Sequence, residues 1–158
     1  MPTESKIRTK AQLMAETAFG RVRAHCETAA GDDPPRLEDG KYLVIARKFP
    51  VLVHTAGLAP ALTYVQAKGR GQGYEAYRTY LDDLAAVLAA AGAVRGTGDA
   101  AALLATVRDA DLRAFMLLTD RVRTAAVWLK RYAEALKTST AERAAVDDAG
   151  GLTVDDET

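Results

Sequence analysis

The sequence predicts an all-α protein: a single compact bundle of about six helices with a flexible acidic C-terminal tail. Alanine and leucine dominate the apolar residues and isoleucine is rare. This bias favours helices, because those two side chains lose little freedom on entering one. Apolar residues recur at steps of three and four, and no alternating stretch is long enough for a strand. We assign residues 1–137 to the helical bundle domain and residues 138–158 to an acidic, disordered tail.

The first helix is expected over residues 4–30, with an apolar stripe from Ile7 to His25. Gly31 and the Asp-Asp-Pro-Pro run at 32–35 then predict a surface loop, because two prolines cannot continue a helix. The second helix begins between residues 37 and 41. Its apolar face consists of Tyr42, Ile45, Ala46, Phe49, Leu52 and Val53.

Pro50 lies inside the second helix and predicts a kink or a brief interruption near residues 46–49. Proline removes one backbone hydrogen bond and clashes with the preceding turn. Gly57 is placed to cap the C-terminus of this helix. Pro60 suits the first turn of a third helix, which runs to Lys68.

The glycine-rich segment 69–73 predicts a flexible loop, followed by a fourth helix over 74–91. Three glycines between 92 and 98 predict the next loop. Asp99 is expected to cap a short helix that ends at Val107, because its carboxylate can accept an orphan backbone N–H. Asp109 or Asp111 is expected to cap the last long helix, whose apolar spacing continues to Lys137.

Charge is distributed unevenly along the 158 residues. Residues 1–137 contain 20 Lys and Arg against 15 Asp and Glu, a net +5, and residues 138–158 contain one Arg against six acids, a net −5. A mildly basic body can meet nucleic acid, and an acidic tail can compete with it. The single cysteine, Cys26, is typical of a reducing compartment. With no signal peptide or membrane span evident, we expect the cytoplasm.

No group of residues has the spacing of a catalytic or cofactor site. His25 and Cys26 point about 100° apart on a helix, and His54 stands at an unrelated spacing, so we expect no metal site. Consecutive acids such as Asp82-Asp83 diverge on a helix and are expected to face water. Segment 69–73 lacks the flanking strand and the GK[ST] ending of a phosphate-binding loop. We therefore expect no enzymatic activity, no cofactor and no small-molecule substrate.

Basic residues are the remaining signal. They include Lys10 on the first helix, Lys41, Arg47 and Lys48 on the second, and Arg121, Arg123, Lys130 and Arg131 on the last. Scattered Lys and Arg can hold phosphate backbones without a base-reading motif. Taken alone, such residues are more typical of a solvated helix face. Trp128 and Tyr132, four apart, could stack on a base, but packing is the more common role of such a pair.

Two segments resemble a known family. Segment 41–65 is similar to the signature of the small α-helical subunit of type III-B (Cmr) CRISPR RNA-guided effector complexes. The matching residues are Tyr42, Ile45, Ala46, Lys48, Pro50, Gly57, Leu58 and Leu62. The stretch VWLKRYAEA at 127–135 is similar to the end of that family's last helix. The resemblance rests on this combination, together with chain length and helical content.

The resemblance implies a subunit that is not a nuclease and acts in antiviral defence. Copies of such subunits stack as a minor filament beside larger backbone subunits, and together they line a groove for the guide–target RNA duplex. The implied partners are other Cmr subunits, copies of this chain, guide RNA and target RNA, with no membrane. The residues that this resemblance assigns to RNA-backbone contact are Arg47, Lys48, Lys130, Arg131, Lys10 and Lys41.

Three other interpretations stay open. A generic helical protein–protein interaction module without RNA contact would use Val44 and Val51, which lie outside the main stripe of the second helix. A DNA-binding helix-turn-helix is compatible with the helix pair around Gly57, but helix 60–68 has few side chains suited to base edges. An enzyme is the least favoured, for want of a nucleophile or a metal ligand set.

Overall fold

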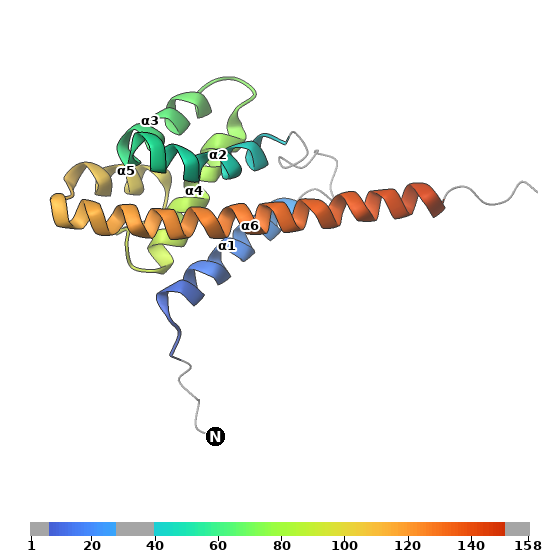
Figure 1. The fold of residues 1–158 in the computed structure, drawn as a ribbon, viewed down its shortest axis with the longest axis horizontal. Helices are drawn as coiled ribbons and strands as arrows, with labels where there is room; N and C mark the ends of the chain where they lie inside the picture. Colours follow the sequence, from blue (N-terminus) through green and yellow to red (C-terminus); the bar gives the residue numbers. More distant parts are fainter. Residues whose placement is uncertain (1–6, 28–39, 151–158) are drawn as a thin grey trace, which may run out of the picture.

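The computed structural model describes the backbone of residues 7–27 and 40–150, and the side chains of 7–26 and 40–136. Within these ranges the chain forms six α-helices and no strand, which confirms the all-α prediction. The helices are α1 (Lys10–Glu27), α2 (Lys41–Ala56), α3 (Leu58–Gly69), α4 (Glu75–Ala90), α5 (Ala100–Asp109) and α6 (Leu112–Gly150) (Figure 1).

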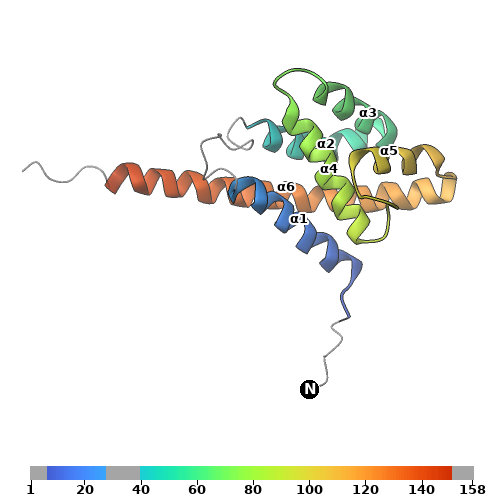
Figure 2. The same cartoon turned by 180° about the vertical axis from the view of Figure 1, so that it is seen from behind.

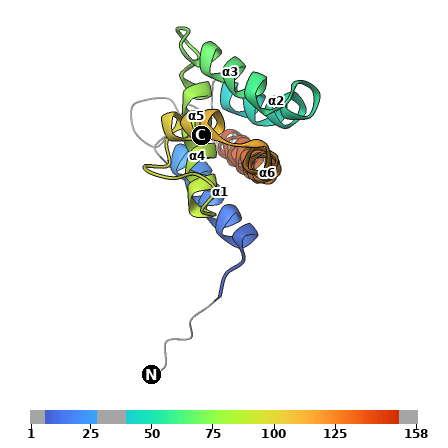
Figure 3. The same cartoon turned by 90° about the vertical axis from the view of Figure 1, so that its left-hand side faces the viewer.

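Helix α4 is the centre of the bundle and contacts each of the other five helices (Figure 2). It is apolar over more than one face, as expected of a helix that is covered on several sides. Tyr80 of α4 packs edge-to-face against Tyr42 and Phe49 of α2, with ring centroids 5.8 and 5.4 Å apart. In the end-on view, α4 and α6 lie side by side, α2 lies above this pair and α1 lies below it (Figure 3). The core therefore forms around α4, and α2 and α6 share one outer side.

The corner between α2 and α3 forms as predicted. Gly57 adopts a φ of 90°, which favours glycine, and its N–H donates to the Val53 carbonyl at 3.1 Å. Pro60 lies in the first turn of α3. Helix α2 continues through Pro50 without a break, so the predicted interruption is wrong, and the kink stays a prediction. Phe49 and Val53 are buried on either side of Pro50 and hold the helix against the core.

Helix α1 begins at Lys10 rather than at residue 4, because Thr9 and Gln12 form a capping box. The Gln12 N–H donates to Thr9 Oγ1 at 3.2 Å, and the Thr9 N–H donates to Gln12 Oε1 at 2.8 Å. Ile7 precedes the helix and its side chain is 93% exposed, so it is not part of the core stripe. The predicted loop at 32–35 lies outside the described residues.

The later caps agree with prediction. Asp99 accepts from the Ala102 N–H at 2.8 Å, and this backbone hydrogen bond lowers the pKa of Asp99. Asp111, and not Asp109, caps α6 by accepting from the Ala114 N–H at 2.8 Å. Helix α6 continues to Gly150, past residue 137, where the apolar spacing ends. The assignment of residues 138–158 to an acidic, disordered tail stays a prediction, and residues 151–158 lie outside the described part of the chain.

Candidate nucleic-acid interface

Helices α2 and α6 lie side by side and run antiparallel (Figure 1). Arg47 Nε donates to Glu134 Oε1 at 2.9 Å, and Arg123 Nη2 donates to His54 Nδ1 at 2.9 Å. The later α2 residue contacts the earlier α6 residue, as expected of antiparallel helices. These two contacts define which residues of α2 lie opposite which residues of α6. We call the surface that they bracket the α2–α6 face. We define it by exposed residues at helical spacing on each helix, which are Val44, Arg47 and Val51 on α2 and Arg123, Val127 and Arg131 on α6.

Apolar side chains lie among the cations of the α2–α6 face. Val51 and Val127 are 59% and 46% exposed, and Val44 is exposed as well. This confirms that Val44 and Val51 lie outside the buried stripe of α2. Arginines interspersed with apolar residues are typical of surfaces that bind partners, because arginine and apolar groups are both favoured at interface centres.

Arg131 differs from the other two arginines of this face, because Arg47 and Arg123 each contact a side chain of the facing helix. It lies one turn before Glu134 on α6, its side chain is exposed, and it makes no ion pair or hydrogen bond with any residue that the structure describes. Lys130 likewise lacks such a partner, but it is half-buried beside the core residue Leu129. Of the two adjacent predicted residues, Arg131 is therefore the better placed to meet a phosphate.

Lys48 is turned from the α2–α6 face towards α3. Its Nζ donates to the Tyr64 hydroxyl at 3.1 Å and lies 5.0 Å from the centre of the Tyr64 ring. Acceptance by the Tyr64 hydroxyl stabilises the ammonium and raises the pKa of Lys48. Tyr64 therefore holds the Lys48 ammonium in place, and Lys48 is exposed on the side of α2 that faces α3.

Lys41 belongs to a second cationic cluster. Its Nζ donates to the Gly73 carbonyl and lies 4.7 Å from the centre of the Tyr74 ring. Lys68, at the end of α3, also lies 4.7 Å from that centre. Sequence reasoning missed Lys68, although the hairpin at Gly57 brings the start of α2 near the end of α3. Lys10 belongs to neither cluster and lines a separate groove together with Arg95 and Arg121.

The aromatic pair on α6 packs as expected. The rings of Trp128 and Tyr132 stack with centroids 5.7 Å apart and planes 17° apart, and Phe19 of α1 meets Tyr132 edge-on at 5.3 Å. Both α6 aromatics are half-buried against the core. The packing interpretation is therefore confirmed.

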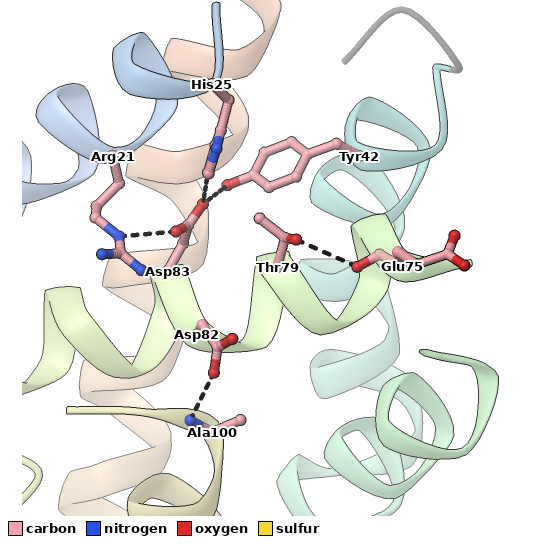
Figure 4. Close-up of polar contacts among 8 residues, drawn as sticks. All are labelled: Arg21, His25, Tyr42, Glu75, Thr79, Asp82, Asp83 and Ala100. Atoms are coloured by element: carbon pink, nitrogen blue, oxygen red, sulfur yellow. Dashed lines mark hydrogen bonds and ion pairs between the residues drawn. The ribbon is translucent and has the colours of Figure 1, made fainter. Parts of the chain in front are cut away.

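The side chain of Asp83 contradicts the expectation that the Asp82-Asp83 pair faces water. Asp83 is 0% exposed and accepts from Arg21 Nε at 2.8 Å and from the Tyr42 hydroxyl at 2.6 Å (Figure 4). His25 Nε2 lies 2.6 Å from the same carboxylate. Asp82 also has a partner, because its Oδ1 accepts from the Ala100 N–H at 3.0 Å. Asp83 faces α1 and α2, and Asp82 faces the start of α5. Each carboxylate therefore accepts hydrogen bonds that join α4 to a neighbouring helix.

The Asp83 cluster joins α1, α2 and α4 rather than forming an open reaction site. Arg21 and Tyr42 donate to the carboxylate, His25 lies within hydrogen-bond reach of it, and the carboxylate itself is completely buried. A buried carboxylate requires such partners, since an unpaired buried charge is costly. Burial and the adjacent Asp83 charge raise the pKa of Tyr42 well above its ordinary value. The hydroxyl therefore stays a donor to Asp83.

Among the residues that the structure describes, no three His, Cys, Asp or Glu side chains gather as a metal site would require. No helix in the same residues has the length and apolar content to cross a membrane.

Comparison with known proteins gives consistent results. The sequence model of the family described as CRISPR-associated protein (Cas_Cmr5) matches residues 10–136. The chain is 38% identical over 130 residues to the "CRISPR system Cmr subunit Cmr5" of Thermus thermophilus, covering 82% of this chain and 97% of that protein. Its fold is similar to the X-ray crystal structure of a CRISPR-associated Cmr5 family protein from Thermus thermophilus. That match has a TM-score of 0.65 and 37% identity, and covers 82% of this chain and 98% of the other.

Proposed function

Because the chain belongs to the Cmr5 family of CRISPR-associated proteins, we propose that it is a non-catalytic small subunit of a type III-B Cmr effector complex. In this proposal copies stack as a minor filament, contact guide and target RNA, and serve antiviral defence in the cytoplasm. Other Cmr subunits choose and cut the RNA. The observation that carries the RNA contact is the exposed Arg131 of the α2–α6 face, which has no ion-pair or hydrogen-bond partner among the described residues.

The contact is electrostatic. Each Lys or Arg that neutralises a phosphate releases condensed counterions, and this provides affinity without reading sequence. Arg131 can bind a phosphate without first breaking an ion pair to a described residue. Arg47 must exchange Glu134 for the phosphate, and it can do so because the Arg47 side chain is 57% exposed. Lys48 extends the charge towards α3. Sequence selection is left to base pairing between guide and target.

The proposal is tested in the assembled complex with two charge-reversed variants, Arg131→Glu and the double variant Arg47→Glu with Lys48→Glu. Both are expected to keep helical content and assembly but to weaken retention of target RNA. The slope of log affinity against log salt should fall by about one for each phosphate that is no longer neutralised. Arg70→Glu, an exposed arginine at the end of α3, is the matched control. Retention equal to wild type in both test variants would remove these residues from the site.

A second candidate is a protein–protein interaction module without RNA contact, favoured by the exposed Val44, Val51 and Val127. An apolar interface responds weakly to ionic strength, because it does not depend on charge screening. Val51→Ser with Val127→Ser would then disrupt assembly, while the charge-reversed variants would behave as wild type. Under the RNA proposal, by contrast, the charge-reversed variants lose target RNA and the valine double variant retains it.

A further inference from the structure

A groove of about 750 Å³ lies at the end of the bundle where α6 begins. Its walls come from the α4–α5 loop, the end of α5, the first turns of α6 and Lys10. Much of its lining is small or apolar, and we call these residues the floor: Ala91, Ala93, Ala102, Ala105, Ala114 and Leu118. Leu117, which also lines the groove, is 56% exposed. A concave apolar floor with a few charged side chains is the usual form of a binding groove.

The charged side chains of the groove favour an acidic occupant. Lys10, Arg95 and Arg121 line it, and none of them makes an ion pair with a residue in the described ranges. The groove also contains Asp109 and Asp111. One carboxylate oxygen of Asp111 is already used to cap α6. The three cations therefore outnumber the acids, and a ligand with both apolar and acidic residues would match floor and wall.

Residues 151–158 of the chain, GLTVDDET, have this composition. Leu152 and Val154 can meet the alanine and leucine floor, and Asp155, Asp156 and Glu157 supply three negative charges for the three cations. The segment follows the end of α6 and lies beyond residues 10–136, which match the family. We propose that the groove binds residues 151–158 of a second copy of this chain.

Geometry selects a second copy over the same chain. Leu118 lines the groove and Gly150 ends the same helix, so about 48 Å of helix separates them at 1.5 Å per residue. Eight extended residues span at most about 27 Å. With α6 helical to Gly150, residues 151–158 of one copy cannot reach the groove of that same copy. Tail-to-groove contact is heterologous and links copies head to tail. This inference rests on the part of the proposed function in which copies stack and assigns that stacking a specific contact, which requires neither RNA nor another subunit.

Two complementary charge-reversed variants of the full chain test the proposal. The groove variant is Arg95→Glu with Arg121→Glu, and the tail variant is Asp155→Lys, Asp156→Lys and Glu157→Lys. Sedimentation velocity at low ionic strength should show self-association of the wild-type chain that is weakened about tenfold or more in either variant. An equal mixture of the two variants should restore association, because the acidic tail of the groove variant meets the unaltered groove of the tail variant. Far-UV circular dichroism verifies that both variants are folded.

The control is Arg70→Glu with Arg78→Glu, which reverses two exposed arginines outside the groove and should associate as wild type does. A wild-type chain that stays monomeric at all concentrations would overturn the proposal, and so would a mixture that fails to associate. Loss of target-RNA retention in the groove variant, with self-association intact, would reassign the groove to RNA. Failure of the RNA proposal is read separately, from Arg131→Glu in the assembled complex.

Discussion

Arg47 of α2 and Glu134 of α6 form an ion pair across the α2–α6 face, with Arg47 Nε 2.9 Å from Glu134 Oε1. The carboxylate neutralises part of the guanidinium charge in the isolated chain. The sequence resemblance assigns Arg47 to RNA contact. The Glu134 carboxylate therefore competes with an RNA phosphate for the Arg47 guanidinium. This arrangement predicts opposite effects for substitutions of the two partners.

Glu134→Gln is expected to increase the affinity of the assembled complex for target RNA, because it releases Arg47 while keeping the shape of residue 134. Arg47→Gln is expected to decrease it. The free energy of unfolding should change by less than about 1 kcal/mol in both, since exposed ion pairs contribute little. Glu16→Gln, which removes an exposed acid paired with Arg8 on α1, is the control and should leave RNA affinity unchanged. Equal affinities for the two α2–α6 variants would contradict this prediction.

Asp83→Asn is expected to destabilise the chain by on the order of 3 kcal/mol, because it removes the buried charge that pairs Arg21 and orients Tyr42. Asp82→Asn should cost less than about 1 kcal/mol, since an amide oxygen can still accept from Ala100. Urea denaturation of the two neighbouring variants measures the difference. Similar midpoints would show that the Asp83 cluster does not hold α1 to α2 and α4.

Two buried tyrosines should respond differently to loss of the hydroxyl. Tyr42→Phe removes a hydrogen bond to the Asp83 carboxylate and should cost about 1.5–3 kcal/mol. The Tyr80 hydroxyl is buried without a hydrogen-bond partner among the described residues. Tyr80→Phe should therefore be neutral or slightly stabilising at pH 7. Thermal unfolding distinguishes them, and a Tyr80→Phe variant that melts as low as Tyr42→Phe would reveal a partner for that hydroxyl.

Stability should decrease at alkaline pH. Burial raises the pKa of both Tyr42 and Tyr80 above the ordinary value near 10. Above that value the unfolded chain loses these protons while the folded chain keeps them, so their contribution to stability is complete below about pH 10 and is lost as pH rises further. Each tyrosine should reduce the free energy of unfolding by about 1.4 kcal/mol per pH unit in that range.

Tyr80→Phe removes one of these groups and should decrease the alkaline slope by about 1.4 kcal/mol per pH unit. Chemical denaturation at pH 8, 10 and 11 measures it. A slope equal to that of wild type would mean that Tyr80 ionises at its ordinary pKa in the folded chain.

The helices and the core could be predicted from the sequence because apolar spacing alone determines which face is buried. Gly57 and Asp99 also followed from local rules. The start of α1 required recognition of the Thr9–Gln12 capping box, a short signal that the longer apolar stripe obscured. Asp83 could not be placed, because its partners lie 41 to 62 residues away and only the tertiary fold brings them together.

The candidate site was predictable only in part, for the same reason. Arg47 of α2 meets Glu134 of α6 because these helices pack antiparallel, and the helical period of the sequence does not specify how helices pack. Lys48 and Lys41 are held by tyrosines of other elements, and Lys10 lies at the separate groove. A list of cations from sequence thus divides into distinct surfaces once the helices pack.

The most direct measurement is a structure of the assembled effector with guide and target RNA, from which the distances between the Arg47 and Arg131 guanidinium nitrogens and the nearest phosphate oxygens are read. The proposed function predicts that this chain is present and that at least one of these distances is about 3 Å. If the chain is absent, or if the α2–α6 face is turned away from every phosphate, the proposal is wrong.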